Sequence, residues 1–92
     1  MKRYIIEREI PGIGASSAVE FCGAARASNQ ALSELPNVQW QHSYVAANKT
    51  FCVYLAEDED AIKKHAELSG FPANTITEAA TIIDPVTANL EA

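Results

Sequence analysis

Residues 40–54 read WQHSYVAANKTFCVY, and this stretch predicts the hairpin around which the fold is built. Two runs rich in β-branched and aromatic residues, 38–45 and 50–56, flank a short polar turn, which is the pattern of two paired strands. The stretch holds the only Trp, one of two His, one of two Cys and two of three Tyr. Because so many side chains have polar tips, the hairpin is the first place to expect a site.

On each side of the hairpin the pattern predicts one helix and one strand. Upstream, residues 3–9 form a strand stopped by Pro11-Gly12, and a capping box of Ser17 and Glu20 opens a helix that Pro36-Asn37 ends. One face of this helix carries Phe21, Ala25, Ser28, Leu32 and Leu35.

Downstream of the hairpin, a second helix is expected over residues 57–69. It begins with four acidic residues, as the helix dipole favours, and is capped by Gly70. The last strand is expected over residues 76–84 and is closed by Asp84-Pro85.

The resulting order, βαββαβ, predicts an α+β protein of the ferredoxin-like split βαβ type: a four-stranded antiparallel sheet with both helices on one face. Residues 1–85 are expected to form this single domain, and residues 86–92 a C-terminal tail. The second face of the sheet has no cover from its own chain. A second copy would cover it, so a homodimer is expected.

The composition restricts the partners. The 92 residues carry 12 acidic and 7 basic side chains, for a net charge of -5, which argues against nucleic acid and anionic membranes. No apolar run reaches the roughly 20 residues of a membrane helix, and the first residues lack a signal-peptide pattern. We therefore expect a cytoplasmic protein, in which two cysteines make no disulfide framework.

The length of the hairpin loop decides which side chains share a face. A three-residue loop, 46–48, would put Asn48 in the left-handed conformation. It would direct one set of side chains away from the helices, namely Trp40, His42, Tyr44, Cys52 and Tyr54. The other set would point toward the helices: Phe51, Val53 and Leu55. A two-residue loop would separate His42 from Cys52. We favour the first register because it makes the helix-facing side of 50–56 aliphatic.

In the favoured register, His42 and Cys52 are neighbours, and both are good ligands for Ni, Zn, Co or Cu. His65 is a possible third ligand, and Glu7 a further oxygen donor. A two-fold dimer would double the number of these candidate ligands. The competing interpretation is that His42 is a hydrogen-bonded interface residue and Cys52 an inert packing residue.

The chain lacks the common catalytic motifs. It has no G-x-S-x-G, no phosphate-binding glycine loop and no H-E-x-x-H, and no oxyanion-hole donor can be assigned to a Cys52–His42 pair. A non-enzymatic protein is expected.

Several segments together resemble a family of small bacterial proteins of about this length, grouped as a domain of unknown function, that includes a nickel-binding, nickel-responsive member. The matching segments are YIIER (4–8), VQWQHSYV (38–45), FCVYLA (51–56), AIKKHAELSGFPANTI (61–76) and DP (84–85). The resemblance implies a ferredoxin-like homodimer and Ni²⁺ as the metal. It marks these family positions: Trp40, His42, Ser43, Tyr44, Cys52, Tyr54, His65, Gly70, Pro72 and Ala73.

Three hypotheses follow. The first is a non-enzymatic cytoplasmic homodimer that binds Ni²⁺ or another divalent transition metal through His42, Cys52 and His65. The second is a small-molecule-binding or cofactor-free monooxygenase-like dimer, whose apolar pocket is lined by Trp40, Tyr44 and Tyr54. The third is a structural dimer held together by the aromatic face.

Overall fold

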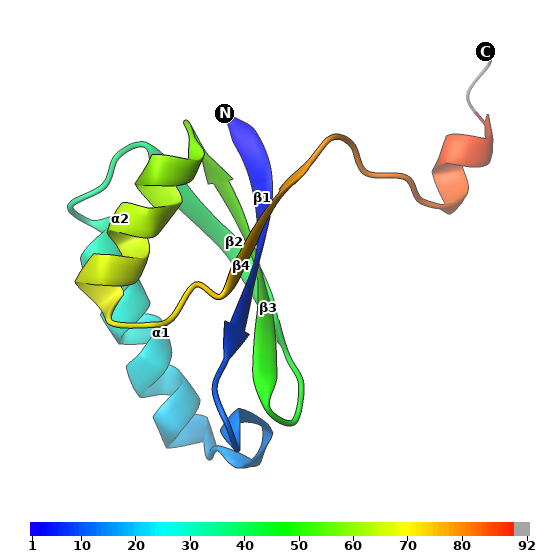
Figure 1. The fold of residues 1–92 in the computed structure, drawn as a ribbon. Coiled ribbons are helices and arrows are strands. Elements are labelled where there is room, and N and C mark those ends of the chain that lie inside the picture. The colour runs from blue at the N-terminus through cyan, green and yellow to red at the C-terminus, as the bar shows by residue number, and fades with distance from the viewer. Residues whose placement is uncertain (90–92) are drawn as a thin grey trace.

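The computed structural model describes residues 1–89 and has the predicted βαββαβ order. Both helices cover one face of a four-stranded antiparallel sheet of order β2-β3-β1-β4, so the ferredoxin-like fold is confirmed (Figure 1). The strands are β1 (Lys2–Glu9), β2 (Val38–Val45), β3 (Lys49–Ala56) and β4 (Thr75–Ala79); the helices are α1 (Ala18–Leu32) and α2 (Glu59–Ser69), with short 3-10 helices η1 (Ile13–Ala15) and η2 (Pro85–Asn89).

The helix ends follow their sequence signals. At the start of α1 the predicted capping box is present, since the Ser17 hydroxyl accepts from the Glu20 amide at 3.2 Å and the Glu20 carboxylate accepts from the Ser17 amide at 2.9 Å. These bonds to Ser17 also lower the pKa of Glu20. The Asp58 side chain caps α2, and Gly70 ends it at φ 79, the left-handed conformation predicted there.

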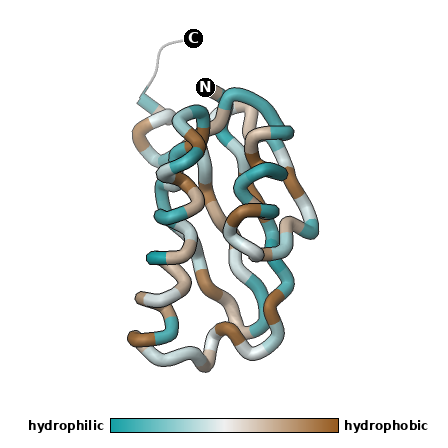
Figure 2. Tube along the Cα trace, turned by 90° about the vertical axis from the view of Figure 1, so that its left-hand side faces the viewer, coloured by the Kyte–Doolittle hydropathy of each residue, from teal (hydrophilic) through white to brown (hydrophobic). Residues whose placement is uncertain are grey.

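The core lies between the sheet and the helices. Figure 2 looks onto this helix layer, with α1 and α2 in front of the strands. Alternate residues of the two central strands point into it, and α2 contributes Ala61 and Ile62. Small side chains at Cys52 and Ala56 allow the helices to approach the sheet closely. The buried cluster comprises Tyr4, Ile6, Val38, Cys52, Tyr54, Ala56, Ala61 and Ile62.

The predicted three-residue hairpin loop is wrong. Residues 46–48 lie between the two strands, but Val45 pairs with Thr50 rather than with Lys49. The Ala46 amide donates to the Lys49 carbonyl at 2.8 Å, so the loop inside this hydrogen bond has two residues, 47–48. Within residues 1–89 only glycines have positive φ, so Asn48 is not left-handed. Its side chain instead accepts from the Gly12 amide at 2.9 Å and fixes the turn.

A β-bulge in β2 separates side chains that simple alternation would group. Trp40 pairs with Tyr54 but His42 pairs with Val53, so Gln41 is an extra residue. Trp40 therefore points toward the helices, whereas His42 points away from them. The predicted common face for His42 and Cys52 is wrong, because the side chain of Cys52 is buried on the helix side.

The last strand is shorter than predicted, because β4 ends at Ala79 rather than Asp84. The chain then leaves the sheet and extends away from the helices to η2 (Figure 1). Three apolar side chains of this segment are exposed: Ile82, Ile83 and Val86. The predicted tail, 86–92, overlaps η2, and residues 90–92 lie outside the described part. Neither described helix has both the length and the apolar character needed to cross a membrane.

A close backbone contact joins η1 to the hairpin turn. The Gly14 amide donates to the Ala47 carbonyl at 3.0 Å. A Cβ atom on Gly14 would lie 2.7 Å from the Ala46 carbonyl oxygen and 2.8 Å from the Ala47 Cα. Both neighbours are backbone atoms, so neither can rotate away.

We expect Gly14→Ala to lower the free energy of unfolding by about 2 kcal/mol, because η1 must move away from the turn. Gly23→Ala is the matched control. No atom lies within 4 Å of a Cβ there. Inside α1 this replacement should stabilise the protein by about 1 kcal/mol. Urea unfolding of both variants measures the difference, and equal stabilities would show that the turn contact is unimportant.

Candidate functional site

The sheet face opposite the helices, here called the outer face, carries an apolar strip formed by Ile5, Phe51 and Val53, with His42 at its edge. Across the paired strands His42 adjoins Val53, which adjoins Ile5. In the next row Tyr44 adjoins Phe51, which adjoins Glu7. His42 and Tyr44 are exposed, and their rings meet edge to face with centroids 5.1 Å apart. An imidazole, a phenol and a carboxylate thus border one apolar strip on which no helix packs, and in which Val53 is 8% exposed and Ile5 and Phe51 are half-buried.

The three predicted metal ligands lie in three different surroundings. His42 is exposed on the outer face. Cys52 is buried on the helix side, where its Sγ lies 3.4 Å from the Thr50 hydroxyl. His65 is fully buried under α2. Among residues 1–89 no group of three His, Cys, Asp or Glu side chains is placed to hold a metal ion. One described chain therefore does not bring the predicted set together.

His65 is held as a neutral side chain. Its Nε2 lies 3.2 Å from the Ser28 hydroxyl, and its ring is 5.1 Å from that of Tyr54. Burial, with a smaller contribution from the positive charge of Arg8, lowers the pKa of His65 to about 4. Its buried Nδ1 has no hydrogen-bond partner within the described residues.

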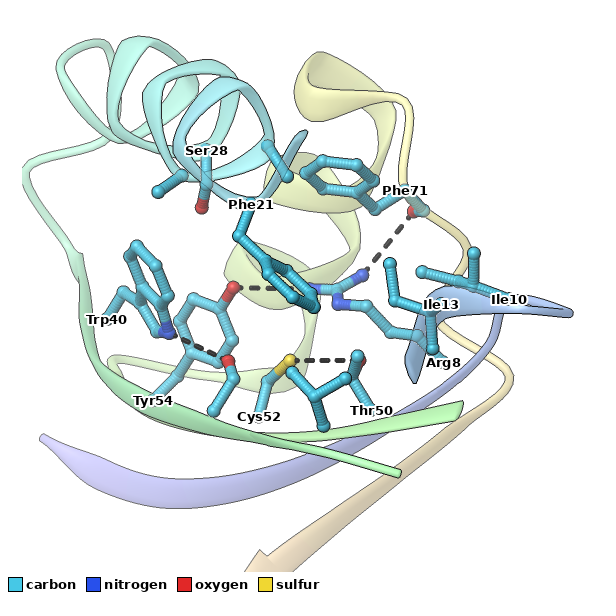
Figure 3. Close-up of a pocket in the computed structure, with 14 residues that line it drawn as sticks. Arg8, Ile10, Ile13, Phe21, Ser28, Trp40, Thr50, Cys52, Tyr54 and Phe71 are labelled. Atoms are coloured by element: carbon cyan, nitrogen blue, oxygen red, sulfur yellow. Dashed lines mark hydrogen bonds between the residues drawn. The ribbon is translucent and has the colours of Figure 1, made fainter. Parts of the chain in front are cut away.

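Beneath α1 lies a cavity of about 310 Å³ (Figure 3). Its floor is the sheet, and its walls come from α1, η1 and the loop that follows α2. Most of the lining side chains are apolar, and the polar ones lie on the floor, except for Ser28 on α1. The lining residues are Arg8, Ile10, Ile13, Phe21, Ala24, Ala25, Ser28, Trp40, Ser43, Val45, Thr50, Cys52, Tyr54 and Phe71.

Two of the three predicted pocket aromatics line this cavity. The indole of Trp40 is fixed by donation from Nε1 to the Ser43 hydroxyl at 3.0 Å. Tyr54 lies on the floor, and burial raises the pKa of its phenol. Tyr44 is 64% exposed on the outer face and does not contribute.

Sequence reasoning missed Arg8, which is only 2% exposed and lies on the cavity floor. Its guanidinium donates to the Pro72 carbonyl at 2.8 Å, the Phe71 carbonyl at 3.4 Å and the Tyr54 hydroxyl at 3.3 Å. Its alternation with Tyr4 and Ile6 was the available signal, because it puts a charge on the apolar face of β1.

These features define a small ferredoxin-like protein with one uncovered sheet face and one cavity on the helix side. The chain belongs to the family described as "Nickel responsive protein SCO4226-like", whose sequence model matches residues 4–79. That match ends at the last residue of β4.

A solved structure, that of SCO4226 from Streptomyces coelicolor A3(2), resembles this chain with a TM-score of 0.75 and 17% sequence identity. The alignment covers 88% of this chain and 99% of that one, and the likeness shows the fold. Comparison with curated proteins finds no match.

Proposed function

We propose that this protein is a cytoplasmic, non-enzymatic homodimer that binds nickel, in which the outer faces of two sheets pack together and His42 is a metal ligand. The observation that carries the proposal is the position of His42, an exposed imidazole beside an uncovered apolar strip. The description of the family as nickel responsive supports the choice of metal. Imidazole is a favoured ligand of Ni²⁺.

The proposal requires two chains because the described residues of one chain gather no set of three ligands. A two-fold dimer presents the same patch twice. Pairing through the outer face would supply two copies of His42, together with the carboxylates and phenols that border the strip. The same pairing would remove the apolar side chains of the strip from water, which favours association.

The segment after β4 supports a second copy as the partner of the outer face. Ile82, Ile83 and Val86 are 59%, 78% and 65% exposed. They belong to the segment that runs from β4 to η2, away from the sheet of its own chain (Figure 1). Apolar side chains gathered on an extension are usually covered by something. One partner subunit would account for both the uncovered strip and the exposed extension.

We expect His42→Ala to weaken Ni²⁺ binding at least tenfold, as loss of a metal-site residue typically does. Calorimetric titration at neutral pH measures it. Gln41→Ala is the matched control, because Gln41 is the exposed neighbour of His42. Equal heats from wild type and His42→Ala would contradict the assigned role.

Cys52 and His65 remain predicted ligands, although both are buried on the helix side of the sheet and His42 is exposed on the outer face. Cys52→Ala belongs in the same titration. If the outer face holds the metal, this variant binds Ni²⁺ as wild type does. A tenfold loss in Cys52→Ala alone would instead locate the metal on the helix side of the sheet.

A further inference from the structure

The guanidinium of Arg8 is a buried cation with no anionic partner among residues 1–89. The ion pairs of this part of the chain join Lys2 to Glu78, Lys49 to Glu7 and Lys63 to Glu59, and none includes Arg8. An arginine stays charged in proteins, and a charge taken out of water is costly unless it is paired. Arg8 is nevertheless only 2% exposed in the folded protein.

The groups around Arg8 are neutral. Its hydrogen-bond acceptors are two backbone carbonyls and the phenol of Tyr54, and the Tyr54 ring lies beneath the guanidinium, 5.8 Å from its carbon to the centroid. Burial raises the pKa of Tyr54, so the phenol does not become an anion near neutral pH. His65 is likewise uncharged. These contacts satisfy some of the five N–H donors and leave the charge uncompensated.

We propose that the cavity beneath α1 binds a small organic monocarboxylate, with its carboxylate on Arg8 and its apolar body against Phe21, Trp40 and Ile13. A guanidinium matches a carboxylate in a two-point geometry, and the pair is stronger than hydrogen bonds between neutral groups. The Thr50 and Tyr54 hydroxyls on the floor and the Ser28 hydroxyl on α1 also line the cavity and provide further polar contacts. This site lies on the opposite side of the sheet from His42 and is independent of the nickel proposal.

The size and the lining of the cavity restrict which ligands can fit. About 310 Å³ corresponds to about ten water molecules at the roughly 30 Å³ that each occupies in the liquid, so the cavity suits a compact ligand such as a single ring with one short substituent. Phe21 and Trp40 contribute aromatic surfaces to the same cavity that Arg8 and Tyr54 line (Figure 3). A compact aromatic or branched acid fits this combination better than an inorganic anion.

Benzoate is the probe for the test, with benzyl alcohol as its uncharged counterpart and inorganic phosphate as an anion without an apolar body. Trp40 fluorescence and calorimetry on the full chain report binding. We expect saturable benzoate binding, and at least tenfold weaker binding of benzyl alcohol and of phosphate. Equal affinity for benzoate and benzyl alcohol, equal affinity for benzoate and phosphate, or no saturable benzoate binding would each overturn the proposal.

Two variants locate the bound probe. Arg8→Gln removes the charge and should weaken benzoate binding at least tenfold. Ala25→Leu keeps Arg8 and fills the cavity from α1, so it should have the same effect even if Arg8→Gln does not fold. Ala27→Leu, on the exposed side of α1, is the matched control and should bind as wild type does. Unchanged benzoate affinity in Ala25→Leu would overturn the assignment, and His42→Ala should leave benzoate binding intact.

Discussion

Lowering the pH from 7 to 4 is expected to reduce the free energy of unfolding by about 3 kcal/mol through His65 alone. Burial holds the pKa of His65 at about 4, below the ordinary value of 6.5. At pH values between about 4 and 6.5, His65 binds a proton in the unfolded chain but not in the folded protein. Stability therefore falls by about 1.4 kcal/mol per pH unit over this window and becomes independent of His65 above and below it.

Urea unfolding at fixed protein concentration, at several pH values between 4 and 7.5, measures this slope. His65→Gln should remove it, although the variant should also be less stable at neutral pH because it loses the packing of a fully buried ring. His42→Gln, which removes an exposed imidazole, is the matched control and should keep the slope. A slope that is the same in wild type and His65→Gln would contradict the role of this histidine.

Ile5→Glu is expected to convert a dimer into a monomer. Ile5 lies at the centre of the outer face, between Val53 and Thr77 on the neighbouring strands. In an isolated chain a glutamate there reaches water. In a two-fold dimer the same substitution puts two carboxylates into the apolar contact, where unpaired charges are costly.

Sedimentation equilibrium measures the mass of the species in solution. Wild type should show about twice the chain mass of 9.9 kDa, and Ile5→Glu the single mass. Val19→Glu changes an apolar residue that is 81% exposed on α1 and should remain dimeric. A monomeric wild type, or an Ile5→Glu variant that dimerises as tightly, would show that the outer face is not the interface.

Local signals in the sequence were sufficient to predict the elements and their order. The Ser17–Glu20 capping box and the Gly70 cap mark helix ends through bonds between near neighbours, so they can be recognised without knowledge of the tertiary fold. Strand–helix alternation then permits few topologies. The end of β4 was less predictable. Residues 80–83 have a strand-like composition, but the pairing of β4 with β1 ends at Ala79.

The candidate site was harder to predict because it depends on the bulge at Gln41. Strict alternation along β2 places Trp40, His42 and Tyr44 on one face, and nothing local, such as a glycine, marks the extra residue. The bulge leaves Trp40 beside Tyr54 and moves His42 to the other side. A two-residue loop was the alternative left open, and it is the loop that the structure has.

Arg8 shows a second limit of sequence reasoning. Its place on the same face as Tyr4 and Ile6 follows from alternation alone. Its burial could not be predicted in this way. Arg8 donates to the carbonyls of Phe71 and Pro72, and both residues are more than 60 positions away in the sequence. Such long-range contacts are set by how α2 and its following loop pack on the sheet, which local patterns do not specify.

The most direct test of the proposed function is native mass spectrometry of the protein with Ni²⁺, because one spectrum reports both the oligomeric state and the number of metal ions. The proposal predicts a dimer that retains nickel, and a His42→Ala dimer that does not retain it at the same metal concentration. Nickel retained by a monomer, or retained equally by the His42→Ala dimer, would contradict a metal site shared across the outer face.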